Sequence, residues 1–328
     1  MTDISKLTIG GTIEAEPFLV DKAITKSARN GGLIMDLSLR NASGRIPAVI
    51  FGCPVKLTGG EVVKVSGTVG HFNGLQVTVD DIAVLLADEA EALMMELLPR
   101  RIPTETIREN VMAIIDGIGD EVIRQFVSEI IAINDRFWSS PGAKRLHHSW
   151  CGGLAEHSYA VASIVSMSAI FYPEVNTDVA VAGALLHDIG KIKELSFSGG
   201  FQYTDEGRML THMYLGAEIV SAHAKEYKTP LDNQVINDIV HIILSHHRDP
   251  EYGAIVKPAT LEAELVAIAD LMDSSMVNLS ELIRNDSNAG GWTAFDSRLT
   301  RCMRKPAASP DIPAPEAAIV ENDGSEPF

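Results

Sequence analysis

The amino-acid sequence predicts an α+β chain of two domains, a small N-terminal β-barrel followed by an all-helical domain. From residue 6 to about residue 86, apolar residues recur with a period of two, which is the pattern of half-buried strands. Beyond that point they recur three and four positions apart, as in helices with one buried face. Histidine and aspartate interrupt those apolar helices, which indicates a buried polar site in the second domain.

The first domain, residues 1–86, is defined by alternation and turn signals. Apolar and polar side chains alternate in residues 32–40 and again in residues 62–70. Asn73-Gly74 lies between two such stretches and predicts a two-residue hairpin turn. About five short strands in some 80 residues favour a small closed barrel.

The rest of the chain is predicted to form a helical connector, residues 87–145, and a helical domain, residues 146–304. Breaks between helices are expected at Pro103-Thr104, at 117–120 and at 139–142. From Pro306 on, the chain lacks Lys and Arg and is rich in Pro, Ala and acidic residues, so residues 305–328 are predicted to be a disordered acidic tail. The later helices are expected over about 154–171, 177–189, 207–226, 232–247 and 258–284.

The formal net charge of −17 is unevenly distributed. Residues 1–85 hold eight basic and eight acidic residues, so the whole acidic excess follows residue 85. Affinity for duplex DNA comes mainly from neutralised phosphates, so this distribution is unfavourable for duplex binding. A nucleic-acid partner would need local basic contacts or bound metal ions.

No apolar stretch reaches the roughly 20 residues that span a bilayer. The N-terminus also lacks the features of a secretory signal. We therefore expect no membrane association and a cytoplasmic location. The three cysteines have no CxxC spacing, which favours neither a disulfide framework nor a thiolate zinc site.

The central motif is LLHDIGK, residues 185–191. A single His-Asp pair is weak evidence, and a single histidine on an apolar helix is more often a hydrogen-bonded core residue. A set of such residues in several apolar helices favours metal ligation instead, and Asp188 could bridge two ions. The set comprises His157, His187, Asp188, His212, His246 and Asp270, with His247 beside His246.

The order of these residues resembles the HD superfamily of metal-dependent phosphohydrolases. The amino-acid sequence resembles the YhaM-type 3′ to 5′ exoribonucleases more closely still, in the segments HHSWCGGLAEH (147–157), AGALLHDIGK (182–191), FQYTDEGR (201–208) and ILSHH (243–247). That family joins an N-terminal OB-fold to a helical HD domain, so the resemblance extends to about residue 300. It implies a nucleic-acid exonuclease.

When the family's metal site is transferred to the matching positions of this sequence, the resemblance implies two divalent ions, with Mn²⁺ favoured and Fe, Zn, Ni or Mg as alternatives. His157, His187, Asp188 and Asp270 would hold the first ion. His212 and His246, with Asp188 shared, would hold the second. For His247 two roles stay open, a ligand or a supporting group, because adjacent histidines can ligate together only at a helix end.

Asp188 and Lys191 are the predicted catalytic residues. A bound ion would lower the pKa of water, and Lys191 would meet a phosphate oxygen. Spacing alone equally allows Lys191 to be a solvated residue at a helix end. His148 and Arg208 are candidate phosphate contacts, and Asp273 is expected to support a ligand or cap a helix.

An OB-fold binds single strands through basic residues and stacking aromatics. Lys22, Lys26 and Arg40 are the predicted substrate contacts of the barrel, with Arg29 and Arg45 also available. The ordinary alternative is scattered surface charge. The only Phe, Tyr or Trp residues before residue 85, in the predicted barrel, are Phe18, Phe51 and Phe72, which we interpret as core residues.

The favoured function is therefore hydrolysis of single-stranded RNA, or of DNA, from the 3′ end to nucleoside 5′-monophosphates. The first alternative is an HD-type phosphatase or phosphodiesterase acting on small nucleotides. The second is a nucleic-acid-binding scaffold whose HD site is silent. A homo-oligomer is compatible with each of these functions.

Overall fold

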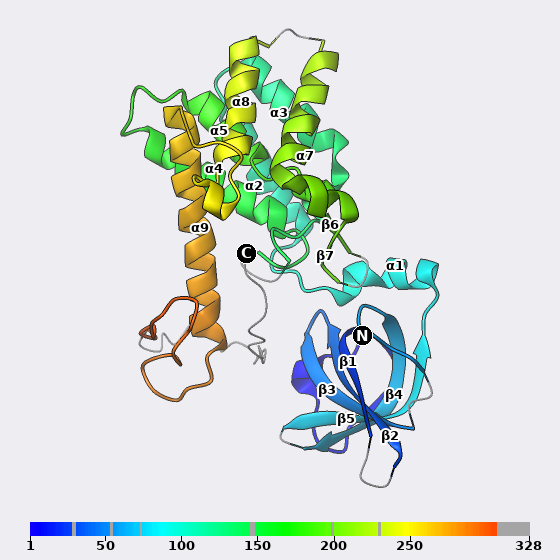
Figure 1. The fold of residues 1–328 in the computed structure, drawn as a ribbon. Coiled ribbons are helices and arrows are strands. Elements are labelled where there is room, and N and C mark those ends of the chain that lie inside the picture. The colour runs from blue at the N-terminus through cyan, green and yellow to red at the C-terminus, as the bar shows by residue number, and fades with distance from the viewer. Residues whose placement is uncertain are drawn as a thin grey trace. The chain divides into compact units, whose positions relative to one another are not determined.

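The computed structural model describes residues 1–27, 31–52, 55–72, 74–144, 148–197, 200–228 and 231–306 (Figure 1). They group into two compact units. Among the described residues, the first contains 1–99, 197–202 and 281–306, and the second contains 100–196 and 203–280. Arg29, His147, Asn73 and the tail from residue 307 lie outside the described residues, so the predictions for Arg29, for the turn at Asn73 and for the tail stay untested.

Five strands close into a barrel in the first unit, as the alternating pattern predicts (Figure 1). Their order is β1-β2-β3-β5-β4, with β3 and β5 parallel, and this order confirms the predicted OB-type barrel. The strands are β1 (Thr12–Ser27), β2 (Leu33–Asn41), β3 (Gly44–Phe51), β4 (Val62–His71) and β5 (Leu75–Val84).

β1 is 16 residues long and pairs with both β2 and β4. Its register shifts once in each pairing, between Val20 and Lys22 opposite β2 and between Ile13 and Glu16 opposite β4. Such bulges bend a strand and let a sheet close. β4 and β5 approach closely at Gly67, where an added Cβ would lie 2.3 Å from the Thr78 carbonyl oxygen. Only glycine fits at this position.

The aromatic side chains of the barrel divide between its inside and its surface. Phe18 is fully buried in the barrel core, as expected. Phe51 is 62% exposed and Phe72 is 70% exposed, so their interpretation as core residues is wrong. Phe51 is the last residue of β3 and Phe72 follows the last residue of β4, where the alternation between faces no longer decides burial.

The second unit is helical, as predicted, and its core is built by apolar side chains such as Phe126, Val161, Leu185 and Ile242. A short α1 (Ala87–Leu97) precedes it in the first unit. None of the described helices is both long and apolar enough to cross a membrane. The helices are α2 (Thr104–Asp116), α3 (Glu121–Ile133), α4 (Gly153–Ala169), α5 (Thr177–Leu186), α6 (Lys191–Glu194), α7 (Asp205–Glu226), α8 (Asn233–Ser245) and α9 (Leu261–Asn285).

Two helices end earlier than the apolar pattern suggests. α5 ends at Leu186, so His187 and Asp188 lie in the turn that follows it, and α8 ends at Ser245, directly before His246 and His247. His187, Asp188 and His246 are nevertheless buried. Both helix ends therefore present polar side chains inside the core.

Candidate metal centre

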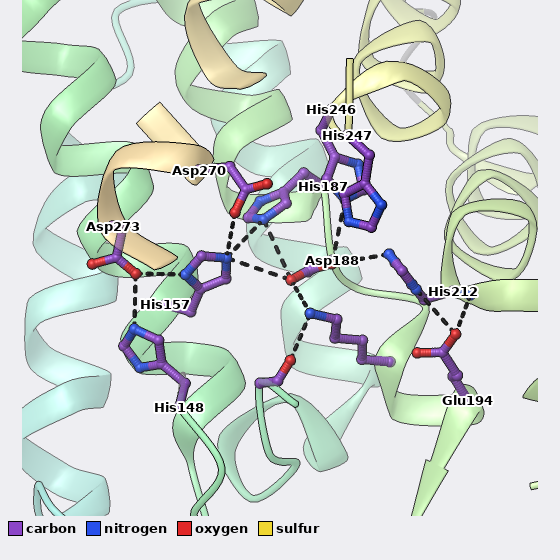
Figure 2. A network of polar contacts seen from close by, with 12 residues as sticks. His148, His157, His187, Asp188, Glu194, His212, His246, His247, Asp270 and Asp273 are labelled. Carbon is purple, nitrogen blue, oxygen red and sulfur yellow. Dashed lines mark hydrogen bonds and ion pairs between the residues drawn. The ribbon is translucent and has the colours of Figure 1, made fainter. Parts of the chain in front are cut away.

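The predicted ligands come together in the second unit from three helices, α4, α7 and α9, and from the two turns that follow α5 and α8 (Figure 2). His157 lies near the start of α4, and Asp270 and Asp273 lie three positions apart on α9. The turn after α5 packs closely on α7 at Gly190, where an added Cβ would lie 1.9 Å from the His212 carbonyl oxygen. Glycine at this position therefore allows the His-Asp turn to reach His212.

Asp188 lies between two groups of ligand atoms. Its Oδ2 faces the first group, at 3.5 Å from His157 Nε2 and 3.4 Å from His187 Nε2. Within that group, His157 Nε2 is 3.1 Å from Asp270 Oδ1 and 3.2 Å from His187 Nε2. Each carboxylate oxygen of Asp188 thus serves a different side of the centre.

The second group faces the other oxygen of the same carboxylate. Asp188 Oδ1 is 3.5 Å from His212 Nε2 and 3.6 Å from His246 Nε2. The ligand atoms of His212, His246 and His247 lie within 4.8 Å of one another. Adjacent histidines can ligate together only at a helix end, because inside a helix they point in different directions. His246 and His247 meet this condition, since they follow the last residue of α8.

Each of the five histidines is held through its Nδ1. His187, His246 and His247 donate to the carbonyl oxygens of Ala184, Ile243 and Tyr252, at 2.8, 2.9 and 2.9 Å. His157 and His212 donate instead to carboxylates, those of Asp273 at 2.7 Å and Glu194 at 3.0 Å. Because a carbonyl or carboxylate only accepts, the proton is on Nδ1 and Nε2 is turned to the centre.

Sequence reasoning missed Glu194. Its Oε1 accepts from both the backbone N–H of His212, at 2.8 Å, and the imidazole Nδ1. This is possible because α7 is interrupted at Thr211, which has φ 61° and ψ 157°, an unusual conformation for a β-branched residue. Burial raises the pKa of Glu194, but the hydrogen bonds from His212 outweigh it and hold the pKa below its usual range.

The centre fits divalent ions. The buried atoms Asp188 Oδ1, His212 Nε2 and His246 Nε2 have no hydrogen-bond partner among the residues that the structure describes. Buried polar atoms are normally satisfied, and leaving them unsatisfied is costly. Imidazole nitrogens and carboxylate oxygens are the donors that Mn, Fe, Zn and Ni accept.

Comparison with known proteins supports the same assignment. A sequence profile of the HD domain matches residues 154–275, which contain every predicted metal ligand. The "3′-5′ exoribonuclease YhaM" of Oceanobacillus iheyensis is 30% identical over 271 residues, covering 80% of this chain and 84% of that protein. The chain belongs to the YhaM family. The predicted family, the HD domain and the hydrolase class are thereby confirmed.

The Bacillus subtilis YhaM protein is 29% identical over 270 residues, covering 80% of this chain and 85% of the relative. A solved domain of replication protein A from Methanococcus maripaludis is 27% identical, with a TM-score of 0.23, over 26% of this chain and 93% of that domain.

In this YhaM chain Lys191 is buried and contacts the centre directly. Its Nζ donates to Asp188 Oδ2 at 2.6 Å and to the Gly142 carbonyl oxygen at 2.5 Å. Burial lowers the pKa of Lys191, but the Asp188 carboxylate raises it above its usual value. Burial raises the pKa of Asp188, and Lys191 and His187 bring it well below its usual range. The solvated interpretation of Lys191 is therefore wrong.

The predicted substrate contacts are dispersed. His148 is buried and its Nε2 donates to Asp273 Oδ2 at 2.8 Å, so Asp273 holds both His148 and His157. Asp273 therefore lies behind a predicted ligand, and its supporting role stays a prediction. Arg208 is exposed, with its guanidinium 5.7 Å from the ring of Tyr203. Phosphate contacts by His148 and Arg208 stay predictions.

In the barrel of this YhaM chain, the basic residues mostly face carboxylates. Lys26 pairs with Asp36 at 2.5 Å, and Arg40 lies 3.4 Å from Asp21. Asp21 also pairs with Arg45 at 2.7 Å. Lys22 is exposed. These pairs reduce the positive charge available to a phosphate, and contact with substrate by the barrel stays a prediction.

Proposed function

We propose that the chain is a divalent-metal-dependent 3′-5′ exonuclease that hydrolyses single-stranded RNA, or DNA, to nucleoside 5′-monophosphates. The observation that carries this proposal is Asp188, a buried carboxylate whose two oxygens face separate histidine groups. A carboxylate shared by two ligand groups is the arrangement expected of a two-ion phosphodiesterase site. The relatives named 3′-5′ exoribonucleases support the substrate and the polarity.

His157, His187 and Asp270 would hold one ion and His212, His246 and His247 the other, with Asp188 common to both. Bound divalent ions, for which we favour Mn²⁺, lower the pKa of water and stabilise charge on phosphoryl oxygens. Lys191 keeps Asp188 ionised and fixed in position through its contact at 2.6 Å. One of its three donors is left for a phosphate oxygen after its contacts with Asp188 and Gly142.

Three side chains of the same unit are suited to hold the scissile end of a strand. Tyr203 is 42% exposed, and Lys144 Nζ and Arg208 Cζ lie 5.6 and 5.7 Å from its ring centre. Two of these residues are close in sequence to residues tied to the metal centre. Lys144 is two residues from Gly142, whose carbonyl oxygen accepts from Lys191. Tyr203 precedes Thr204, whose backbone N–H donates to the Glu194 carbonyl oxygen. Cations beside an aromatic ring suit a phosphate and its base.

The test is hydrolysis of a 5′-labelled single-stranded RNA by wild-type chain and by Asp188→Ala, with and without Mn²⁺. A ladder of shortened labelled products that requires both metal and Asp188 is expected. Asp135→Asn, which changes an exposed aspartate in the same unit, is the matched control and should retain the ladder.

Other products would contradict the proposal. Immediate release of a labelled mononucleotide would show that the RNA is degraded from its 5′ end. Intact RNA, together with metal-dependent hydrolysis of mononucleotides or cyclic nucleotides, would establish the small-nucleotide alternative. We place the enzyme in the cytoplasm, where such RNA is found.

A further inference from the structure

After α9 the chain folds back on itself in a short antiparallel ribbon, residues 291–305, the orange to red end of the chain in Figure 1. We call this segment the C-terminal ribbon. Thr293 N–H donates to the Met303 carbonyl at 2.9 Å, and Lys305 N–H donates to the Gly291 carbonyl at 2.8 Å. Lys305 Nζ also pairs with Asp286 Oδ1 at 2.6 Å, which ties the ribbon to the end of α9.

The surface of the C-terminal ribbon differs from the rest of this acidic chain. It carries four basic residues and one acidic residue, a net charge of +3, in a protein whose formal net charge is −17. Trp292 is 58% exposed and Phe295 is 64% exposed. Two exposed aromatic rings within one short basic segment form a candidate contact surface.

The arginines of the ribbon are largely available to a ligand. Arg298 pairs with Asp296 at 3.1 Å. Arg301 and Arg304 make no ion pair within the part of the chain that the structure describes. The ribbon pairs Trp292 directly with Arg304, and residues paired in this way project on the same face. An aromatic ring and an available guanidinium therefore lie side by side.

We propose that the C-terminal ribbon is a second binding site for single-stranded RNA, outside the HD domain. Trp292 and Phe295 stack on bases, while Arg301 and Arg304 contact phosphates. Exposed aromatics interleaved with arginines bind single strands without sequence preference. The net charge of +3 in this segment of an acidic chain favours a polyanionic ligand. This inference rests on the proposed function, because it names a further contact for that enzyme's substrate.

The test is equilibrium binding of the full-length chain to a fluorescent single-stranded RNA with phosphorothioate linkages, over a range of salt concentrations. Arg301→Glu/Arg304→Glu is expected to raise Kd about tenfold or more and to reduce the slope of log Kd against log salt by about 1.4, for two lost phosphate contacts. Trp292→Ala/Phe295→Ala is expected to raise Kd about tenfold and leave the slope unchanged.

Matched controls separate the ribbon from general effects. Lys225→Glu/Lys228→Glu makes the same change in charge on α7 and the residues after it, and Phe171→Ala/Tyr172→Ala removes two exposed aromatics at the end of α4. Both should bind RNA within about twofold of wild type. Unchanged RNA affinity in the ribbon variants, or equal losses in the controls, would overturn the proposal.

Two further measurements separate RNA binding by the ribbon from self-association and from catalysis. Mass measurement in solution would overturn the proposal if the aromatic variant dissociates an oligomer while its RNA affinity stays unchanged, because the ribbon would then join copies of the chain. Hydrolysis of a dinucleotide should retain the wild-type kcat in every ribbon variant. A wild-type chain that binds RNA through the ribbon but hydrolyses none would refute the proposed function and leave the ribbon site intact.

Discussion

In the second unit, charged and imidazole side chains from helices α4, α7 and α9 and from the turns after α5 and α8 face a single buried centre, whereas in the barrel the charged side chains lie on the surface and pair with one another. His157 and Asp188 are almost completely buried, and their positions are fixed by packing and hydrogen bonds. Lys26 and Arg40 are more accessible, and each faces an aspartate. Burial forces polar groups into a specific arrangement, and exposure does not.

The largest expected effect separates the two ligand groups. His157→Gln and His246→Gln should each lose about one ion per chain, and each should lower kcat on RNA by on the order of 10³ or more, because each removes a ligand of a different ion. Metal content by elemental analysis and single-strand hydrolysis measure this. His71→Gln, in an exposed position of the barrel, is the control. Loss of both ions from either variant would show that the groups are not separate.

The next effect concerns the carboxylates behind the histidines. Glu194→Gln and Asp273→Asn should weaken metal affinity about 10- to 100-fold, because they remove the charge that orients His212 and His157 and strengthens them as ligands. Titration of metal-free protein with Mn²⁺ measures the affinity. Glu218→Gln, at the surface of α7, is the control and should bind as wild type does. Equal affinity in all three would assign Glu194 and Asp273 a purely structural role.

A smaller effect is expected from pH. Burial lowers the pKa of His157, but its contacts with Asp270 and Asp273 raise it to about 9 in the metal-free protein. Metal must displace a proton below that pH, so affinity should rise with pH by up to about tenfold per unit and level off above pH about 9. Calorimetry in buffers of different ionisation enthalpy should show about one proton released at pH 7. Release of no proton would contradict a protonated His157.

The smallest effect is expected in the barrel. Lys26→Ala and Arg40→Ala should each change RNA affinity by less than about threefold, because each side chain already faces a carboxylate and exposed pairs contribute little. The same binding measurement as for the ribbon variants applies. A tenfold loss in either variant would show that the barrel contacts RNA in spite of these pairs.

The clustering of these histidines and aspartates could be predicted because a set of such residues in several apolar helices is satisfied by one shared polar centre, and their metal ligation stays a prediction. The barrel could be predicted because alternation over residues 32–40 and 62–70 leaves one face for a core. In both cases the pattern within each segment marks its own residues as buried. The burial of the residues follows from that pattern, so the sequence suffices.

Other features depend on contacts between distant segments. Glu194 could not be identified, because its contact with His212 requires the interruption at Thr211, which no local signal marks. The pairing of Arg40 with Asp21 depends on the register between β1 and β2. The exposure of Phe51 depends on where β3 ends.

The interruption of α7 at Thr211 has a consequence for how such an enzyme can diverge. The turn before it carries Arg208, which is exposed beside Tyr203, and the segment after it begins with His212. Because the helical hydrogen-bond ladder is broken between them, a substitution in the first piece is not transmitted along a continuous rod to the second. Substitutions around Arg208 can therefore accumulate while the position of His212 is inherited unchanged.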